Sequence, residues 1–154
     1  MKMRRSDREI TDPEEISEIL EKAQVCRLAF SCNDEPYIVP MNFGFKDNHL
    51  YLHSAPEGRK ISILHRNNRV CFEVDIETEL VKSDRPCNWG MEYRSVVGSG
   101  AAVFIEDPTE KKRILDIIMA KYSHEKHHEY DENILKNVAI IKVHVEDMNA
   151  KGRI

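Results

Sequence analysis

Two segments of the chain have the spacing of amphipathic helices. Residues 11–23 and 106–122 each have an aspartate followed by a proline at their second and third positions, which suit the cap and the first position of a helix. Glu110 completes a capping box in the second segment. Apolar residues recur at helical spacing, at Ile16, Ile19 and Leu20 after the Asp12 cap and at Ile114, Leu115, Ile118 and Met119 after the Asp107 cap. Both segments are therefore predicted to form helices that bury one face.

The other apolar positions alternate with polar ones in short runs. In residues 69–75, Val70, Phe72 and Val74 share one face, and Ile141, Val143 and Val145 do the same in residues 138–147. The turn Asp47-Asn48 separates residues 37–46 from 49–54, which predicts a hairpin. Further runs occupy residues 25–31 and 93–106, and the polar residues 76–92 are expected to interrupt the strands. Alternation of this kind is typical of strands with one buried face.

Evenly spaced short strands with one-sided patterns predict a mainly β fold. A length of 154 residues suits a single domain, here residues 1–154, with a real hydrophobic core. The pattern favours an antiparallel β-barrel with flanking helices over a parallel α/β sheet.

Composition excludes several classes of protein. Charged residues make up 32% of the chain and the net charge is −4, which argues against a general nucleic-acid binder. No apolar run reaches the ~18–20 residues of a membrane span, and residues 1–10 lack the apolar segment of a signal peptide. The four cysteines show no paired spacing, so we expect mostly buried, reduced thiols in a cytoplasmic protein: Cys26, Cys32, Cys71 and Cys87.

The stretch "HSAPEGRK" places unusual chemistry between a strand and a helix. If Leu50 and Leu52 face the core, His53 lies on the opposite face with Tyr51. Ser54, Gly58, Arg59 and Lys60 then surround the first turn of a helix, where exposed N–H groups, a hydroxyl and two cations favour an anion such as phosphate. The same residue types are equally compatible with a solvated helix face.

A wider pattern resembles a known family. The segments "YIVPMNFGF", "HSAPEGRK", "VCFEV" and "YRSVVGSGAA" resemble the pyridoxamine 5′-phosphate oxidase-like family of flavin-binding split barrels, and in particular its nitroimidazole-resistance (Nim-type) branch. The resemblance runs over nearly the whole chain. It implies an antiparallel split β-barrel that forms a homodimer, with FMN in a cleft at the subunit interface.

The resemblance also assigns residues to the cofactor. Arg59 and Lys60 correspond to the pair that holds the FMN phosphate, and His53 and Ser54 correspond to the strand end beside it. The backbone of residues 39–42 would lie along the isoalloxazine ring, and a later strand would contribute two more residues. The predicted cofactor-binding residues are Val39, Pro40, Met41, Asn42, His53, Ser54, Arg59, Lys60, Arg94 and Ser95.

The function implied is that of an FMN-dependent oxidoreductase acting on a small molecule. The branch name implies a nitro-aromatic (nitroimidazole) reductase, with His53 as the catalytic residue. The chain ends in "EDMNAKGRI" and lacks the arginine and tryptophan segment with which pyridoxamine-phosphate oxidases proper hold their substrate, so vitamin B6 synthesis is not expected. An alternative is a non-catalytic protein that stores or senses flavin, or that binds haem through His53 or a histidine of residues 124–128.

Two further groups of residues leave structural and functional interpretations open. His124, His127 and His128 lack the spacing of a zinc site, so an exposed loop is predicted rather than a metal site. Trp89 and Tyr93 suit either a structural anchor or an aromatic wall of the ligand cleft.

Overall fold

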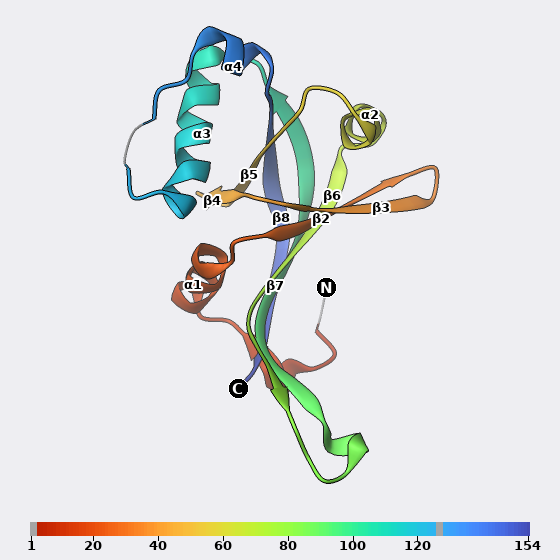
Figure 1. Cartoon of the computed structure of the whole chain (residues 1–154). Helices are drawn as coiled ribbons and strands as arrows, with labels where there is room; N and C mark the ends of the chain where they lie inside the picture. The colour runs from red at the N-terminus through yellow and green to blue at the C-terminus, as the bar shows by residue number, and fades with distance from the viewer. Residues whose placement is uncertain (1–2, 126–127) are drawn as a thin grey trace.

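The structure, a computed structural model, describes residues 3–125 and 128–154 (Figure 1). The helices of these ranges are α1 (Pro13–Lys22), α2 (Arg59–Arg66), α3 (Pro108–Tyr122), α4 (Glu132–Lys136) and the 3-10 turns η1 (Ser6–Arg8) and η2 (Pro86–Asn88). The strands are β1 (Glu9–Ile10), β2 (Cys26–Cys32), β3 (Glu35–Met41), β4 (Gly44–Lys46), β5 (His49–Ser54), β6 (Arg69–Val81), β7 (Gly90–Ile105) and β8 (Ala139–Arg153).

The strands form one antiparallel sheet in the order β3-β2-β6-β7-β8-β5-β4, with β1 added beside β8. The two edges of this sheet, β3 and β4, are consecutive along the chain and meet at Asn42 and Phe43 without pairing. The sheet is therefore curled but split between β3 and β4. This confirms the predicted mainly β fold and its antiparallel split barrel.

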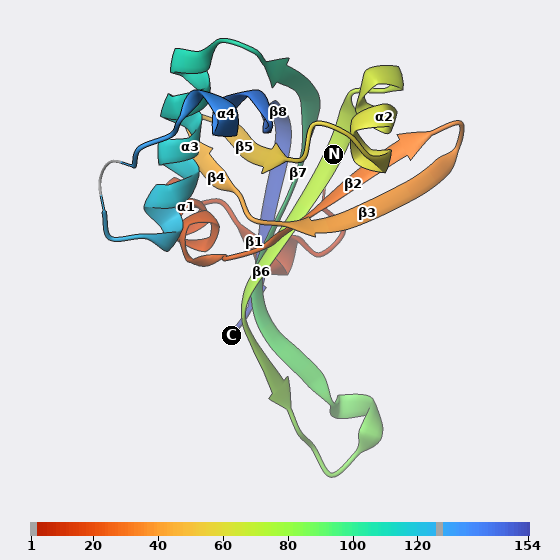
Figure 2. The same ribbon diagram turned by 45° about the horizontal axis from the view of Figure 1, so that its top comes forward.

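The core occupies the inside of the curled sheet. The alternating residues of β6 and β8 point inward as predicted, and Phe72, Val74 and Ile141 are fully buried. A second, smaller cluster lies between α3, α4 and the outer face of β5, where Tyr51 packs against Ile114 and its neighbours. The helices α3 and α4 thus cover one side of the barrel, and α2 lies beside the β2–β3 hairpin (Figures 1 and 2).

Both predicted helix caps are present. The Asp12 carboxylate accepts a hydrogen bond from the amide of Glu14 at 3.0 Å, and the Asp107 carboxylate accepts one from the amide of Glu110 at 2.9 Å. The Glu110 carboxylate instead pairs with Arg113 at 2.6 Å, so the reciprocal half of the predicted capping box is replaced by a surface ion pair.

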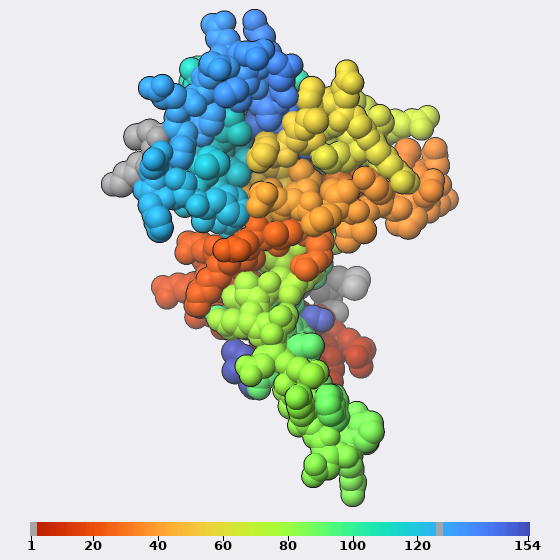
Figure 3. Space-filling view, viewed as in Figure 1, coloured from red at the N-terminus to blue at the C-terminus, as the bar shows by residue number. Residues whose placement is uncertain are grey.

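The polar residues 76–92 interrupt the strands over a shorter range than expected, residues 82–89. After a bulge at residues 76–79, β6 and β7 continue as a paired ribbon in which Leu80 lies opposite Met91. This arm, residues 77–93, projects from the barrel (green in Figures 1 and 2) and stands out in the space-filling view of Figure 3. The expectation failed because the ribbon lies outside the barrel, where polar side chains on a strand cost nothing. β8 also continues past residue 147 to Arg153, where it pairs with β1 and β7 and buries Ala150.

The cysteines correct one expectation. Cys26 is buried and burial raises the pKa of its thiol to about 12, whereas Cys71 and Cys87 are exposed. Cys71 points outward because its neighbours Val70 and Phe72 point into the core. All four thiols are free. Among the helices that the structure describes, none is long and apolar enough to cross a membrane.

Candidate functional site

The end of β5 carries the histidine and the hydroxyl predicted from the sequence. Leu50 and Leu52 are buried, and His53 lies on the other face of the strand, where it is exposed. Ser54 ends the strand, is buried, and donates a hydrogen bond from Oγ to the carbonyl of Ala55 at 2.9 Å. His53 therefore presents its ring to the surface, whereas the Ser54 hydroxyl hydrogen has a partner within the chain.

His53 is electrostatically coupled to the start of α2. Partial desolvation, and then the positive charge of Lys60, lower the pKa of His53 below its ordinary value. The start of α2 therefore acts on the end of β5 through the charge of Lys60. Because its pKa is lowered from 6.5, the His53 imidazole is neutral at pH 7 and can donate from one ring nitrogen and accept at the other.

The start of α2 is suited to an anion. Its N-cap is Gly58, with φ 124° and ψ 176°, and no side chain caps the first turn. The turn contains no acidic residue and opens instead on Arg59 and Lys60. A helix N-terminus carries a partial positive charge, so these two cations increase a potential that already attracts anions. The Cβ atom that Gly58 lacks would meet nothing within 4 Å, so there is open space over this turn.

Arg59 connects α2 to β3. Its guanidinium lies 4.3 Å from the centre of the Tyr37 ring, and its Nη2 lies 3.7 Å from a carboxylate oxygen of Glu35. Both charged side chains are largely exposed, so this ion pair is weak and can be exchanged for a stronger anion. Tyr37 was missed by the sequence reasoning, because nothing in the local pattern shows that the β2–β3 hairpin lies beside α2.

Residues 39–42 lie at an edge of the sheet. β3 pairs only with β2, so one side of its backbone is left free by the sheet. Pro40 suits this edge because proline has no N–H for a ladder. Val39 and Met41 are half-buried against the core, whereas Pro40 and Asn42 are exposed. The expectation that backbone groups of this strand line a planar ligand stays a prediction.

The corner after β3 is held by the end of α3. The Tyr122 hydroxyl donates to the carbonyl of Gln24 at 2.7 Å and accepts from the amide of Phe43 at 3.0 Å. The Lys121 ammonium donates to the carbonyls of Leu20, Glu21 and Ala23 at the end of α1. These contacts fix the direction in which β3 leaves Asn42.

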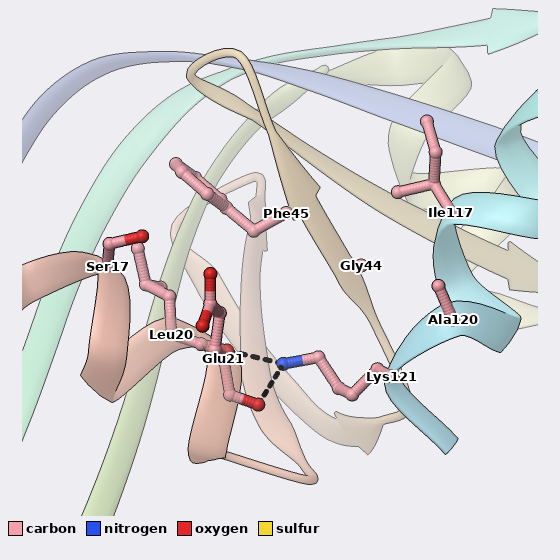
Figure 4. Close-up of a pocket in the computed structure, with 8 residues that line it drawn as sticks. All are labelled: Ser17, Leu20, Glu21, Gly44, Phe45, Ile117, Ala120 and Lys121. Carbon is pink, nitrogen blue, oxygen red and sulfur yellow. Dashed lines mark hydrogen bonds between the residues drawn. The ribbon is translucent and has the colours of Figure 1, made fainter. Parts of the chain in front are cut away.

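A cavity of about 340 Å³ lies elsewhere, between α1, β4 and α3 (Figure 4). Burial lowers the pKa of Lys121 at its wall to about 8, but the donors of this ammonium are engaged by carbonyls of α1. None of the predicted cofactor residues is among its lining: Ser17, Leu20, Glu21, Gly44, Phe45, Ile117, Ala120 and Lys121. The cavity lies where α1, β4 and α3 come together, and the Lys121 contacts with α1 form part of its wall.

The structure places Arg94 and Ser95 far along β7 from the end of α2. Arg94 lies at the base of the arm, about seven residues along β7 from Ala101, which pairs with Arg69 just after α2. At ~3.3 Å per residue this is roughly 20 Å. The Arg94 guanidinium is bound by Glu77 through both oxygens at 2.7 Å and by Glu18 at 3.0 Å. Within one chain it therefore fastens α1 to the arm.

The charges around Arg94 support that structural role. Arg94, with help from Lys22, lowers the pKa of Glu18 to about 2, and the pKa of Arg94 is raised by Glu77 and Glu18. Ser95 is buried beside it and lies opposite Asp75 on β6. A contact of either residue with a cofactor stays a prediction.

The histidine-rich segment and the two arm aromatics lie away from α2. His124 is exposed and His128 is near Glu125, while His127 is outside the described residues. In residues 3–125 and 128–154, no group of three or more metal-ligating side chains is brought together. Trp89 donates its indole N–H to the Ser83 carbonyl and so anchors the turn of the arm. Tyr93 lies at the base of the arm, near Lys151.

The comparisons with known proteins agree with the split barrel. Residues 12–152 match the family model described as pyridoxamine 5′-phosphate oxidase. The chain belongs to this family.

The solved structures refine that relationship. A candidate 5-nitroimidazole antibiotic resistance protein from Bacteroides thetaiotaomicron is 39% identical, with a TM-score of 0.84 over 94% of this chain and 86% of that one. The flavocytochrome Anf3 from Azotobacter vinelandii is 20% identical, with a TM-score of 0.86 over 99% and 72% of the two chains. The FAD and haem binding protein from Mycobacterium smegmatis is 15% identical, with a TM-score of 0.85 over 94% and 73%. The last two show the shared fold alone.

One curated relative matches over a shorter range. An uncharacterized protein of Rhizobium meliloti (strain 1021) is 34% identical over 61 residues, which span 40% of this chain and 40% of that protein. The match covers less than half of the relative's length.

Proposed function

We propose that this protein is an FMN-dependent oxidoreductase that acts on a small molecule, and that nitro-aromatic compounds such as nitroimidazoles are its substrate class. The observation that carries the proposal is the start of α2, where an uncapped first turn, Arg59 and Lys60 surround open space. Membership of the family and the 39% identical resistance protein support the choice of a flavin and of the substrate class.

The residues present fit FMN. A phosphate dianion above Gly58 would receive the free amides of the first turn and charge-assisted bonds from Arg59 and Lys60. The free edge of β3 would support the ring system through the backbone of residues 39–42. FMN, when bound, would supply the hydride or electron transfer.

The protein's own residues then have distinct tasks. Arg59 and Lys60 bind and orient the phosphate, and the half-buried Val39 and Met41 hold β3 in place. The neutral imidazole of His53 is placed at the end of β5 to hold or transfer a proton through a ring nitrogen. A second copy of the chain, in a homodimer, would close the cleft over the exposed edge and exclude water from it.

A second function is favoured by one observation, the exposure of His53. An exposed, neutral imidazole at the mouth of a flavin or haem site can also serve as an axial ligand. The flavocytochrome and the FAD and haem binding protein share the fold and combine such groups, as their names state. The alternative is therefore a protein that stores flavin or binds haem without turnover.

The visible spectrum of freshly purified protein tests the proposal. We expect flavin absorption that bleaches on addition of NADH or NADPH without oxygen and returns on addition of a nitro-aromatic acceptor. A bound flavin that neither nucleotide reduces would support storage, and a Soret band would support haem. Protein that is colourless and takes up neither added FMN nor haem would contradict both functions.

A further inference from the structure

Two histidines lie opposite each other on the outer face of the sheet. His49 begins β5 and His144 lies on β8, and the two are direct partners in the antiparallel ladder. Leu50 and Val143 beside them are buried, so both imidazoles are directed away from the core, with His144 exposed and His49 half-buried. His49 lies five residues along β5 from Ser54, which at ~3.3 Å per residue is roughly 17 Å. The pair is therefore separate from the candidate flavin site.

The spacing of the two rings is unusual for a hydrogen bond. His144 Nδ1 lies 3.4 Å from His49 Nε2, whereas a hydrogen bond from a ring N–H is typically about 2.9–3.0 Å long. Rings that pointed straight at each other across this gap would have their centres ~5.6 Å apart, because each nitrogen lies ~1.1 Å from its ring centre. The centres are only 5.1 Å apart. The rings therefore meet at an angle.

The same two distances match a shared metal ion. Zinc binds imidazole nitrogens at ~2.0–2.1 Å in tetrahedral geometry, which places two such nitrogens about 3.3–3.4 Å apart and their ring centres about 5.2 Å apart. The observed values are 3.4 Å and 5.1 Å. A square-planar ion would bring the nitrogens to about 2.9 Å. The geometry thus favours a tetrahedral ion over both a hydrogen bond and a planar site.

The backbone fixes the tautomer of His49. Its Nδ1 lies 2.7 Å from the carbonyl oxygen of Asp47, and a carbonyl can only accept, so Nδ1 carries a hydrogen and donates it. In the neutral ring Nε2 therefore keeps its lone pair, and this is the nitrogen that faces His144. Histidines that bind metals almost always donate their other N–H to a backbone carbonyl, a carboxylate or a water in this way.

The turn before His49 holds the two rings at this spacing. Asp47 and Asn48 have φ 50° and 61°, the left-handed conformation that a tight hairpin turn requires. The Asn48 side chain donates to the carbonyl of Val145 at 2.8 Å, and the Asn48 carbonyl accepts from the amide of Val145 at 3.1 Å. The β4–β5 hairpin is thus fastened to β8 at the residue after His144. The rings are therefore positioned before any ion binds.

The surroundings leave the pair accessible. β7 presents the small Ala101 opposite His144. Within residues 3–125 and 128–154, no third histidine, cysteine or carboxylate side chain joins the pair, so an ion bound here would keep two positions for water. Lys46 lies opposite His49 on β4, and Lys142 lies two residues before His144. Two ligands beside two positive charges favour moderate affinity rather than the tight binding of a closed structural site.

We propose that His49 and His144 bind one zinc ion, through Nε2 and Nδ1 respectively. Neutral imidazole suits this ion, and the spacing of the two nitrogens suits its tetrahedral geometry. The ion would cross-link β5 to β8 beside the β4–β5 hairpin, so its binding stabilises the folded chain. The site goes beyond the proposed function, because it uses none of the residues assigned to the flavin.

Zinc titration of flavin-free protein without a histidine tag tests the proposal. Competition with a chromogenic chelator gives the zinc dissociation constant of the wild type, His49→Ala, His144→Ala and the control His124→Ala. His124 is exposed and lies in the histidine-rich segment, so the control reports binding by surface histidines in general. We expect His124→Ala to bind like the wild type, and the other two variants to bind at least ~10-fold more weakly because one imidazole cannot chelate. Circular dichroism in the presence of a chelator checks that each variant folds.

Thermal unfolding and cobalt absorption give two further measurements. Zinc should raise the melting temperature of the wild type but not that of His144→Ala. Cobalt(II) absorbs visible light strongly in tetrahedral sites and weakly in octahedral ones, so strong bands are expected in the wild type and not in His144→Ala.

Two results would overturn the proposal. Equal zinc affinity of the wild type and His144→Ala would place the ion elsewhere, and a wild type that binds no zinc would leave the pair as a long hydrogen bond. All measurements use flavin-free protein, so a failure to bind FMN would leave this result intact, and the reverse also holds.

Discussion

The helices of this protein begin in two different ways. α1 and α3 each have an aspartate cap, a proline at the first position and a glutamate in the first turn, and these carboxylates suit the helix dipole. α2 has a glycine cap in a backbone conformation that other residues avoid, and two cations where the dipole is already positive. The start of α2 therefore lacks each feature that stabilises the starts of α1 and α3: a side-chain cap, a proline and an acidic residue in the first turn.

The difference separates stability from binding. An aspartate at position 58 would satisfy the first-turn amides of α2 and would also occupy the space in which an anion can bind. Leaving the turn uncapped keeps its amides and both cations available, at the expense of local stability. We therefore expect changes at α2 to alter ligand binding and turnover, and changes at α1 and α3 to alter stability alone.

The largest effect is expected for the double substitution Arg59→Ala, Lys60→Ala. Each charge-assisted phosphate contact contributes on the order of 1.5–3 kcal/mol, so FMN should bind at least ~100-fold more weakly. Riboflavin, which has no phosphate, should bind almost as it does to the wild type. Fluorescence titration of both flavins measures this, with Arg66→Ala at the far end of α2 as the control. An equal loss for FMN and riboflavin would count against the phosphate site.

Replacing His53 with alanine should affect turnover rather than binding. Arg59 and Lys60 remain, so FMN affinity should change little, whereas turnover should fall by ~10²-fold if the imidazole transfers a proton in the transition state. The melting temperature and the rate of flavin reoxidation by a nitro-aromatic acceptor are measured on one preparation. A lowered melting temperature with an unchanged rate would leave His53 as a structural residue.

Gly58→Ala should lower the free energy of unfolding by about 1–3 kcal/mol, because the cap residue has φ 124° and ψ 176°. The added methyl group meets no neighbour within 4 Å, so the effect arises from the backbone conformation. Urea unfolding of flavin-free protein measures it. Glu57→Ala, at the exposed preceding position, is the control and should change stability by less than about 0.5 kcal/mol.

Asp107→Ala should lower the free energy of unfolding by about 1 kcal/mol, through loss of the 2.9 Å cap hydrogen bond at the start of α3. Asp107→Ser, which keeps an oxygen acceptor, should recover most of that loss. FMN affinity should be the same in both variants. If Asp107→Ala weakened FMN as much as the α2 double variant does, the division between the two kinds of helix start would fail.

The smallest effect is the expected change in the pKa of His53 when Lys60 is replaced. Lys60→Met removes a positive charge that lowers this pKa, so the pKa should rise toward its ordinary value of 6.5. The lowered pKa means that the unfolded chain binds this proton more readily, so folded wild type loses stability as the pH falls through 6.5. That loss should be smaller in Lys60→Met. NMR titration of the His53 ring measures the pKa, and a downward shift would contradict the coupling.

Much of the fold could be predicted because its signals are local. The Asp-Pro starts of α1 and α3 and the alternation around Phe72 and Ile141 each depend on neighbouring residues, and the structure agrees with them. The arm could not be found in this way. Its strands carry Glu79 and Glu92 in water, so the pattern of a buried strand is missing, and only their pairing shows that they are strands.

The candidate site was predictable to a similar extent. The stretch from His53 to Lys60 is continuous in sequence, so its strand end, turn and helix start could be placed by local rules. Tyr37 beneath Arg59 could not, because twenty-two positions separate them along the chain and only the packing of α2 on the β2–β3 hairpin joins them. The ion pairs of Arg94 with Glu18 and Glu77 could not be predicted either, because they join three distant segments of the chain, and its predicted contact with a cofactor stays a prediction.

The sequence by itself determined the helix starts, the inward and outward faces of the strands, and the hydroxyl and cations of residues 53–60, which suit an anion such as phosphate. These follow from steric and electrostatic preferences that act over a few residues. Only the tertiary structure decided that β3 is a free edge, that Arg59 lies over Tyr37 and that Arg94 holds the root of an exposed arm. Each of these depends on contacts between segments that are far apart along the chain. The packing that stabilises such contacts cannot be read from the order of neighbouring residues.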